Sequence, residues 1–308
     1  ADLSVSVASL DSLLHPKPDG VIGRAQAKAA DAFGAKKTYF VTNGSSTSNK
    51  IILQSLLAPG DKILIDRACH KSTFHGIILT GARPVLLEAS VSKHGIYGPV
   101  PRRVILEAIK NHPDAKVLML TSCTYDGLIY DLKPIVDAAH RNGGEGRPRI
   151  RVVVDAAWFS FARFHPDFRP TALECGADYT TESTHKTLSA LSQASMIHVN
   201  DPDHDSRAFG EALQMHLSTS PNYAIIASLD VARKQMVMEG YSLLDRALRI
   251  SRELREKINA TRVFRVLSLE ELLADDVRDD NIRLDPTKLT VDISASGYSV
   301  EEVISALL

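Results

Sequence analysis

The sequence has little of several residue types, and each shortage excludes a class of protein. Its 308 residues include three cysteines and one tryptophan. The cysteines are odd in number, widely spaced and not in a CxxC pair, so they predict neither a disulfide framework nor a zinc site. Lysine and arginine total 36 against 37 aspartate and glutamate residues, and the formal net charge is −1. With no excess of positive charge, we do not expect binding to nucleic acid or to an anionic membrane.

Long hydrophobic runs are also missing. Apolar stretches such as 116–121 and 151–154 are far shorter than the roughly 20 residues of a membrane-spanning helix. No basic segment followed by an apolar one opens the chain, so we expect a cytoplasmic protein without a secretory signal. The composition is 44% hydrophobic and 24% charged, which is typical of a folded globular chain.

Both ends of the sequence suggest a fragment of a longer protein. The chain begins at Ala1 without a methionine and ends at Leu308 inside a predicted helix. That helix has a capping box, Ser299 with Glu302, but no terminating glycine or proline. The alternative is a natural C-terminal helix, since many chains end in one.

Strands and helices alternate along most of the chain. Segments rich in β-branched and apolar residues predict seven strands, at 38–42, 62–65, 84–87, 116–121, 151–154, 179–181 and 195–199. Helices are predicted at 24–33, 47–57, 71–79, 104–109 and 132–142. This alternation predicts an α/β fold, in which helices sandwich a mostly parallel seven-stranded sheet.

The last part of the chain predicts a long helix and the start of a second unit. The helix is expected to begin at Ser242, because apolar residues recur at helical spacing and would form one buried stripe. The stripe consists of Leu243, Ala247, Ile250, Leu254 and Ile258. An acidic loop at 270–280, a strand at 289–293 and a helix at 299–308 follow. We therefore expect a large domain at 1–240, and at 241–308 a linking helix with the beginning of a small C-terminal α/β domain.

Polar residues capable of chemistry follow five of the predicted strands. They occur at 45–47, 66–70, 122–127, 155–158 and 183–186. The carboxyl ends of parallel strands share one edge of the sheet, and ligands bind there. The sequence therefore predicts a single site at this edge.

Ser45, Ser46 and Thr47 lie where the first strand turns into a helix. Free backbone N–H groups at a helix start, together with short hydroxyl groups, suit a phosphate. The alternative is that these hydroxyls only cap the helix. Neither a Walker A motif nor a GxGxxG motif is present, so we do not assign the phosphate to a nucleotide.

Asp155, Trp158 and Lys186 are the next candidates. A carboxylate at the end of a buried strand needs a cationic or hydrogen-bonding partner, although Asp155 could simply cap the following segment. Lys186 precedes an apolar stretch, where desolvation favours the nucleophilic amine; a solvated surface lysine is the alternative. Trp158 would form a flat wall or be buried in the core. His70 and His75 lack a third ligand at a recognisable spacing, so no metal is expected.

These groups together are the parts needed to hold pyridoxal 5′-phosphate. The hydroxyls would bind its phosphate and the aromatic wall would face its ring. Lys186 would form a Schiff base with it, and Asp155 would keep the pyridine nitrogen protonated so that the ring accepts electrons.

Five sequence segments are more specific than the individual candidate residues as a signal of a protein family. They are FVTNGSSTSNK (40–50), ILIDRACHKS (63–72), TYDG (124–127), DAAWFSFARFHP (155–166) and STHKTLSALSQASMIHV (183–199). These segments resemble the major domain of the ornithine/lysine/arginine decarboxylases, and the similarity extends over most of the chain. The resemblance implies an aspartate-aminotransferase-like fold, the type I fold of pyridoxal-phosphate enzymes.

The resemblance also implies roles for individual residues. Lys186 would carry the cofactor, Asp155 would pair with the pyridinium nitrogen, and His70 would stack on the ring. Residues near the phosphate or the ring would be Ser45, Ser46, Thr47, Ala157, Trp158, Ser183 and His185. The stretch MHLSTSPNY (215–223) resembles a family segment that crosses a dimer interface, so Thr219 or Ser220 would contact the phosphate of a partner subunit in a homodimer or higher homo-oligomer.

The implied activity is decarboxylation of a basic L-amino acid (lysine, arginine or ornithine) to the amine and carbon dioxide. Lys186 or His185 would return a proton to Cα, and Tyr125 and Asp126 are weaker candidates on the substrate side. Three alternatives stay open at this point. They are another pyridoxal-phosphate reaction, such as transamination, oxidation or elimination; a truncated regulatory relative; and a nucleotide-binding oxidoreductase, which the missing glycine-rich motif argues against.

Overall fold

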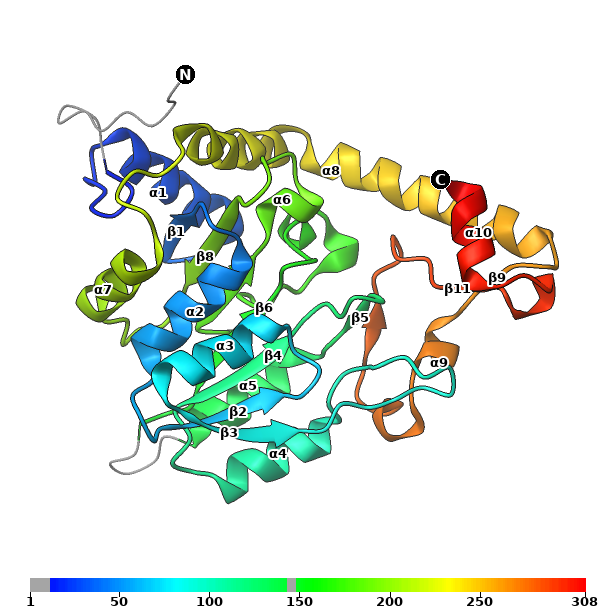
Figure 1. Cartoon of the computed structure of the whole chain (residues 1–308), viewed down its shortest axis with the longest axis horizontal. Helices are drawn as coiled ribbons and strands as arrows, with labels where there is room; N and C mark the ends of the chain where they lie inside the picture. The colour runs from blue at the N-terminus through cyan, green and yellow to red at the C-terminus, as the bar shows by residue number, and fades with distance from the viewer. Residues whose placement is uncertain (1–11, 143–147) are drawn as a thin grey trace.

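A seven-stranded sheet is the centre of the fold in the computed structural model, which describes residues 12–142 and 148–308 (Figure 1). The strand order is β1-β8-β7-β6-β4-β2-β3, and every neighbouring pair is parallel except the two pairs that β8 makes with β1 and β7. The strands are β1 (Lys37–Val41), β2 (Lys62–Asp66), β3 (Arg83–Leu87), β4 (Val117–Thr121), β6 (Arg151–Asp155), β7 (Tyr179–Glu182) and β8 (Ser195–Val199). The predicted mostly parallel seven-stranded sheet is confirmed.

Helices cover both faces of this sheet (Figure 1). Alternate strand residues belong to different cores: Ile63 and Ile65 pack on one face of the sheet, and Leu64 packs on the other. The first face packs against α1 (Val21–Phe33), α2 (Ser45–Leu56), α3 (Lys71–Thr80), α7 (Ser206–His216) and the start of α8 (Tyr223–Ala260). The second face packs against α4 (Arg102–Asn111) and α5 (Leu132–Arg141). Strands buried on both sides explain the nearly continuous apolar runs in the sequence.

The long helix α8 begins earlier than predicted. It starts at Tyr223 rather than at Ser242, and the side chain of Asn222 caps it by accepting a hydrogen bond from the N–H of Ala224 over 2.9 Å. The first half of the helix packs Ile226 and Leu229 against the sheet core. The single stripe used for the prediction covered only the second half, so the true start was missed.

The predicted buried stripe on α8 is also wrong. Leu243, Ile250 and Leu254 are 40%, 43% and 44% exposed. The neighbouring residues Leu244 and Leu248 are buried instead, in a cluster that also contains several phenylalanines. One residue turns a helix by about 100°, so two apolar stripes side by side fit the same spacing, and only the packing partner decides which one is buried.

The segment after α8 forms small elements that rest on the large part of the chain. Two-residue strands pair antiparallel, β10 (Arg283–Leu284) with β5 (Leu128–Ile129) and β11 (Val291–Asp292) with β9 (Arg265–Val266). The predicted strand at 289–293 is therefore shorter than expected. The expected loop at 270–280 contains the end of α9 (Leu269–Leu272) and a 3-10 turn at Asp275–Val277. The remaining elements are α6 (Thr184–Thr187), α10 (Val300–Leu307), and 3-10 turns at Ala162–Phe164, Pro166–Phe168 and Ser294–Ser296. The division into domains at residue 240 stays a prediction.

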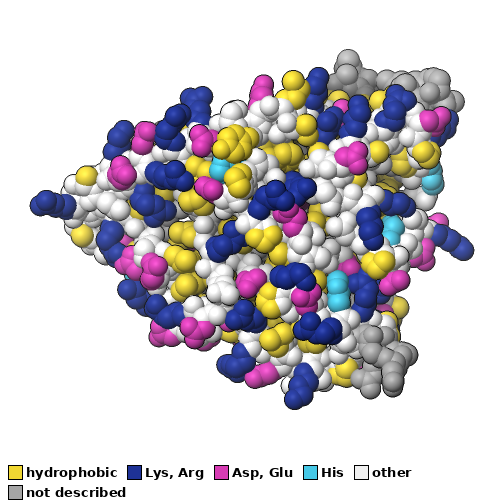
Figure 2. Space-filling model, turned by 180° about the vertical axis from the view of Figure 1, so that it is seen from behind, with side chains coloured by type: hydrophobic (Ala, Val, Ile, Leu, Met, Phe, Trp, Pro, Cys, Tyr) yellow, Lys and Arg dark blue, Asp and Glu magenta, His cyan; other side chains and the backbone are white. Residues whose placement is uncertain are grey.

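The surface carries charges of both signs. Figure 2 shows lysine and arginine side chains interspersed with aspartate and glutamate on one face of the molecule, in keeping with the formal net charge of −1. Within residues 12–142 and 148–308, no helix is both long enough and apolar enough to cross a membrane.

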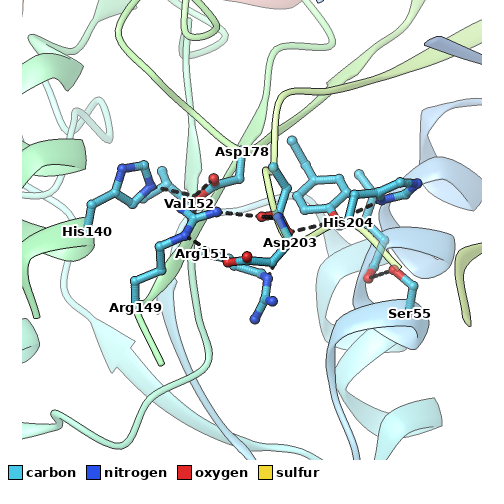
Figure 3. A network of polar contacts seen from close by, with 11 residues as sticks. Ser55, His140, Arg149, Arg151, Val152, Asp178, Asp203 and His204 are labelled. Atoms are coloured by element: carbon cyan, nitrogen blue, oxygen red, sulfur yellow. Dashed lines mark hydrogen bonds and ion pairs between the residues drawn. The ribbon is translucent and has the colours of Figure 1, made fainter. Parts of the chain in front are cut away.

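A network of charged side chains ties together the amino ends of β6 and β7 (Figure 3). The guanidinium of Arg149 contacts the carboxylates of Asp178, at 2.7 Å, and of Asp201. Arg151 Nε lies 2.8 Å from the second oxygen of Asp201, and the hydroxyl of Tyr179 donates to that oxygen over 3.1 Å. Burial alone would raise the pKa of Asp201, but hydrogen bonds from Arg151 and from the backbone of Asp203, with the charges of both arginines, hold it below its ordinary value.

We predict that this network contributes to stability mainly through Asp201. Its side chain is 0% exposed, so Asp201→Ala leaves Arg151 without its partner in a partly buried place and should lower the free energy of unfolding by about 3 kcal/mol. Asp203 also contacts Arg149, but it is 63% exposed, so Asp203→Ala serves as the matched control and should cost less than about 1 kcal/mol. Urea denaturation followed by circular dichroism measures both values. Equal effects of the two substitutions would contradict the prediction.

Candidate active site

A cavity of about 430 Å³ lies at the carboxyl ends of the parallel strands. Ten of the individual residues predicted from the sequence line it together: Ser45, Ser46, His70, Tyr125, Asp155, Ala157, Trp158, Ser183, His185 and Lys186. They come from the carboxyl end of β6 and from the segments after β1, β2, β4, β6 and β7. Other residues at and after the end of β4, and two residues before β8, complete the wall. The predicted convergence of strand ends on one site is what the fold produces.

Helix α2 directs its amino end at this cavity. Its N-cap is Gly44, which has a φ of +79°, a conformation that favours glycine. The interpretation of the serines as simple N-caps is therefore wrong, and the hydroxyls of Ser45 and Ser46 are left to line the cavity. Ser183 Oγ donates to Ser45 Oγ over 2.6 Å, which joins the segment after β7 to the helix start. Thr47 is buried in the first turn and does not line the cavity.

Asp155 ends β6 with its carboxylate fixed on both oxygens. Oδ1 accepts the N–H of Ala157 over 3.0 Å, and Oδ2 accepts Nδ2 of Asn49 over 2.8 Å. The residue is 4% exposed and lines the cavity. Asp155 thus shapes the following turn and also presents its carboxylate to the site. Asn49, in α2, was not predicted from the sequence.

His70 is the N-cap of α3, and contacts with Ser72 fix its imidazole ring through Nδ1. Its Nδ1 accepts the N–H of Ser72 over 3.2 Å and lies 2.8 Å from Ser72 Oγ. The same hydroxyl accepts a hydrogen bond from Asn49 over 3.0 Å, so one chain of contacts connects His70 to Asp155. Burial lowers the pKa of His70, Lys186 and other nearby cations lower it further, and Asp155 opposes them. These effects together favour the neutral imidazole, a flat ring suited to stacking.

Lys186 lies in the one-turn helix α6 and reaches the cavity beside Trp158. Its Nζ is 4.4 Å from the centroid of the indole ring. Burial lowers the pKa of Lys186, the charge of Asp155 opposes this, and the charge of Lys288 lowers it further. Trp158 is half-buried and lines the cavity rather than the core, whereas Lys186 is exposed in this chain and also lines the cavity. An amine with a lowered pKa at the mouth of a cavity is suited to nucleophilic attack.

His185 is oriented by a single strong contact. Its Nδ1 lies 2.8 Å from the carbonyl oxygen of Ala194. Because a carbonyl only accepts, Nδ1 carries the proton in the neutral ring. Nε2 is then left for a ligand in the cavity that His185 lines.

Other predictions about the site have mixed outcomes. Thr219 and Ser220 lie in the exposed segment between α7 and α8 and do not line the cavity; their role toward a partner subunit stays a prediction. No cluster of three His, Cys, Asp or Glu side chains suited to a metal occurs in the part of the chain that the structure describes. Tyr125 lines the cavity, while Asp126 lines an adjoining hollow of about 320 Å³ that shares Ala68, Thr121 and Tyr125 with it.

Sequence reasoning missed several residues that line the site or hold its side chains in place. Besides Asn49 and Ser72, it missed Gln193, whose carbonyl accepts the N–H of Gly44 over 2.8 Å and closes the loop beside α2. It also missed Lys288, whose Nζ lies 4.3 Å from the centroid of Trp158. The Asn-Gly pair at 43–44 signalled the turn, but nothing in the sequence pairs Asn49 with Asp155 or Lys288 with Trp158.

Known structures with this architecture define the class. A ureidoglycine-glyoxylate aminotransferase from Bacillus subtilis has a TM-score of 0.68 over 98% of this chain and 76% of its own, at 16% identity. That identity shows the fold alone, which is the aspartate-aminotransferase-like type I fold of pyridoxal-phosphate enzymes.

Sequence comparison assigns the chain more narrowly than the fold does, to one family. The sequence profile described as "Orn/Lys/Arg decarboxylase, major domain" matches residues 1–306, and the chain belongs to this family. An arginine decarboxylase of Bacillus cereus is 34% identical over 96% of this chain. The lysine decarboxylase LdcA of Pseudomonas aeruginosa is 41% identical over 77% of it. The structure of lysine decarboxylase A from that organism covers 98% of this chain and 46% of its own, with a TM-score of 0.80 at 34% identity. The chain spans 63% and 33% of the length of the first two relatives.

Proposed function

We propose that this chain holds pyridoxal 5′-phosphate and supports decarboxylation of a basic L-amino acid to the amine and carbon dioxide. The observation that carries the proposal is that Lys186, Asp155 and the hydroxyl-rich start of α2 face one cavity. The relatives are named for arginine and for lysine, so we propose lysine, arginine or ornithine as the substrate without choosing among them.

The residues of the cavity fit the cofactor in their donor chemistry. For a phosphate there are the hydroxyls of Ser45, Ser46 and Ser183, and the free N–H groups at the start of α2, where the helix dipole favours an anion. His185 offers Nε2 to the same wall. For a ring nitrogen there is the carboxylate of Asp155, held in place by Asn49 and by the backbone of Ala157. The volume of about 430 Å³ lies in the range usual for small-molecule sites.

Each side chain would then have a task in decarboxylation. When bound, pyridoxal phosphate supplies an electron sink for the pair released as the bond between Cα and the carboxylate breaks. Asp155 would accept a hydrogen bond from the ring nitrogen and so favour a proton on it. His70 would contact one face of the ring, and Trp158 would close the side next to Lys186. Lys186 would hold the cofactor through its amine and would return a proton to Cα; His185 is the alternative donor.

We propose that the functional assembly is a homodimer or a higher homo-oligomer in the cytoplasm. The exposed position of Thr219 and Ser220 is compatible with contact to a partner's phosphate site. A protein that contributes residues to its neighbour's site needs at least two chains.

The test is reconstitution of the purified chain with pyridoxal phosphate. We expect visible absorbance that borohydride bleaches, a pyridoxyl group on the peptide containing Lys186, and release of carbon dioxide with an amine from one of the three amino acids. Formation of a keto acid would assign another reaction to the same site. Failure to attach the cofactor would overturn the proposal and favour a regulatory relative.

A further inference from the structure

Lys288 reaches the mouth of the cavity from the far end of the chain. Strand β10 pairs with β5, and the N–H of Asp285 donates to the carbonyl of Gly127 over 2.8 Å. Gly127 has a φ of +96°, and a Cβ added there would lie 2.9 Å from Cβ of Lys288. The two loops therefore touch closely only because residue 127 is glycine. This contact, and not nearness in sequence, brings Lys288 to the site.

The ammonium of Lys288 lies over aromatic rings of the site. Its Nζ is 4.3 Å from the centroid of Trp158 and 5.4 Å from that of Tyr125, and these two rings meet edge to face at 5.4 Å. Such positions over aromatic rings attract a cation. Among the described residues, no ion pair within 4.0 Å holds the Lys288 ammonium. Its charge therefore faces the site without a direct ion pair, and it also acts on the carboxylates of Asp126 and Asp285 from a longer distance.

Lys186 lies over the same indole. Its Nζ is 4.4 Å from the Trp158 centroid. Both ammonium nitrogens lie within 4.4 Å of the centroid of Trp158, so they are less than about 9 Å apart. This separation is close to the Debye length at physiological salt. The two charges therefore repel each other inside a partly closed site, where screening is weaker than in water.

We propose that Lys288 is a positioning residue of the site: its ammonium, which lies over the same indole ring as Lys186, favours the neutral form of Lys186, the form that attacks pyridoxal phosphate. This inference rests on the proposed function, because only there does the Lys186 amine attack pyridoxal phosphate. A second cation beside a reactive lysine is a known means of activation.

Asp155, His70 and His185 are the carboxylate and imidazole side chains that line the cavity with Lys186. Burial lowers the pKa of Lys186, Asp155 opposes this, and Lys288 adds to it. His70 and His185 also line the cavity, and the pKa of His70 is itself lowered, first by burial, so it adds little positive charge near pH 7. Burial raises the pKa of Asp126, which Lys288 partly offsets. Lys288 is thus the one full cation next to Lys186 that acts against the pull of Asp155 among the described residues.

Trp158 is the only tryptophan of the 308 residues, so its fluorescence reports on this site alone. In the cofactor-free chain we expect a fluorescence transition with pH that the variant Lys186→Met lacks, which assigns the transition to Lys186. In Lys288→Met its midpoint should move to higher pH, and in Lys288→Arg, which keeps the charge, it should stay near the wild-type value. The rate at which acetic anhydride acylates Lys186, followed by peptide mass spectrometry over the same pH range, should shift in parallel.

An unchanged midpoint in Lys288→Met would overturn the inference. Circular dichroism checks that the variant folds, and Lys288→Gln replaces it if it does not. The titration uses no cofactor and no turnover. A shifted midpoint in a chain that decarboxylates nothing would therefore overturn only the proposed function, and an active chain with an unshifted midpoint would overturn only the role of Lys288.

Discussion

Lys186→Ala is expected to abolish covalent attachment of pyridoxal phosphate and to lower turnover by at least ~10³-fold, since the residue would both anchor the cofactor and return the proton to Cα. Alanine leaves the backbone bond from the N–H of Lys186 to the carbonyl of Ser183 in place. It also removes an ammonium rather than a buried apolar group. The loss should therefore come from chemistry and not from unfolding.

The measurement is carbon dioxide release from the best substrate, with borohydride reduction in parallel. Lys234, on the exposed side of α8, gives the matched control, and Lys234→Ala should retain wild-type turnover and attachment. A Lys186→Ala protein that decarboxylates at a normal rate would refute the assignment of Lys186.

Asp155→Ala is expected to lower kcat by ~10³-fold or more while some cofactor still binds. Without this carboxylate, nothing in the cavity wall holds a proton on the ring nitrogen, and the electron pair from the broken bond loses its acceptor. Because that interaction strengthens as the bond breaks, kcat and kcat/KM should fall together. The hydroxyls of Ser45, Ser46 and Ser183, which would hold the phosphate, are untouched, and cofactor binding should therefore persist.

The hydrogen bond from Asn49 allows a graded control. Asn49→Ala removes one of the two bonds that orient Asp155 but leaves its charge, so it should slow turnover only about tenfold. Steady-state kinetics on both variants, with absorbance to count bound cofactor, tests the order. If Asp155→Ala were no slower than Asn49→Ala, the carboxylate would not act on the cofactor ring.

Much of the fold could be predicted because local pattern and final packing agree. Runs such as 116–121 and 151–154 are apolar on both sides of the strand, and in the structure both sides are covered by helices. The direction of β8 was not predictable in the same way, since an antiparallel strand has the same apolar pattern. The start of α8 was missed because the stripe used for the prediction covers only its second half. Its buried side was missed because it depends on Phe159 and Phe168, which are far away in sequence.

The candidate site could be predicted where residues end strands. Ser45, Asp155 and Lys186 follow from the position of the strand ends, and all three line the cavity. The supporting residues could not be predicted by this rule. Asn49 contacts Asp155 across 106 positions of sequence, and Lys288 depends on a pair of two-residue strands. Contacts of this kind leave no local signal.

The cavity and its rim have separate origins along the chain. Every residue that lines the cavity lies between Gly44 and Gln193, whereas the segment carrying β10 supplies Lys288 from outside that span. Mutation can therefore alter the charge at the entrance while the floor that would bind the cofactor is inherited intact. This separation allows a substitution in one peripheral segment, which is attached at β5 and Gly127, to change the charge at the entrance without changing the residues that would bind the cofactor.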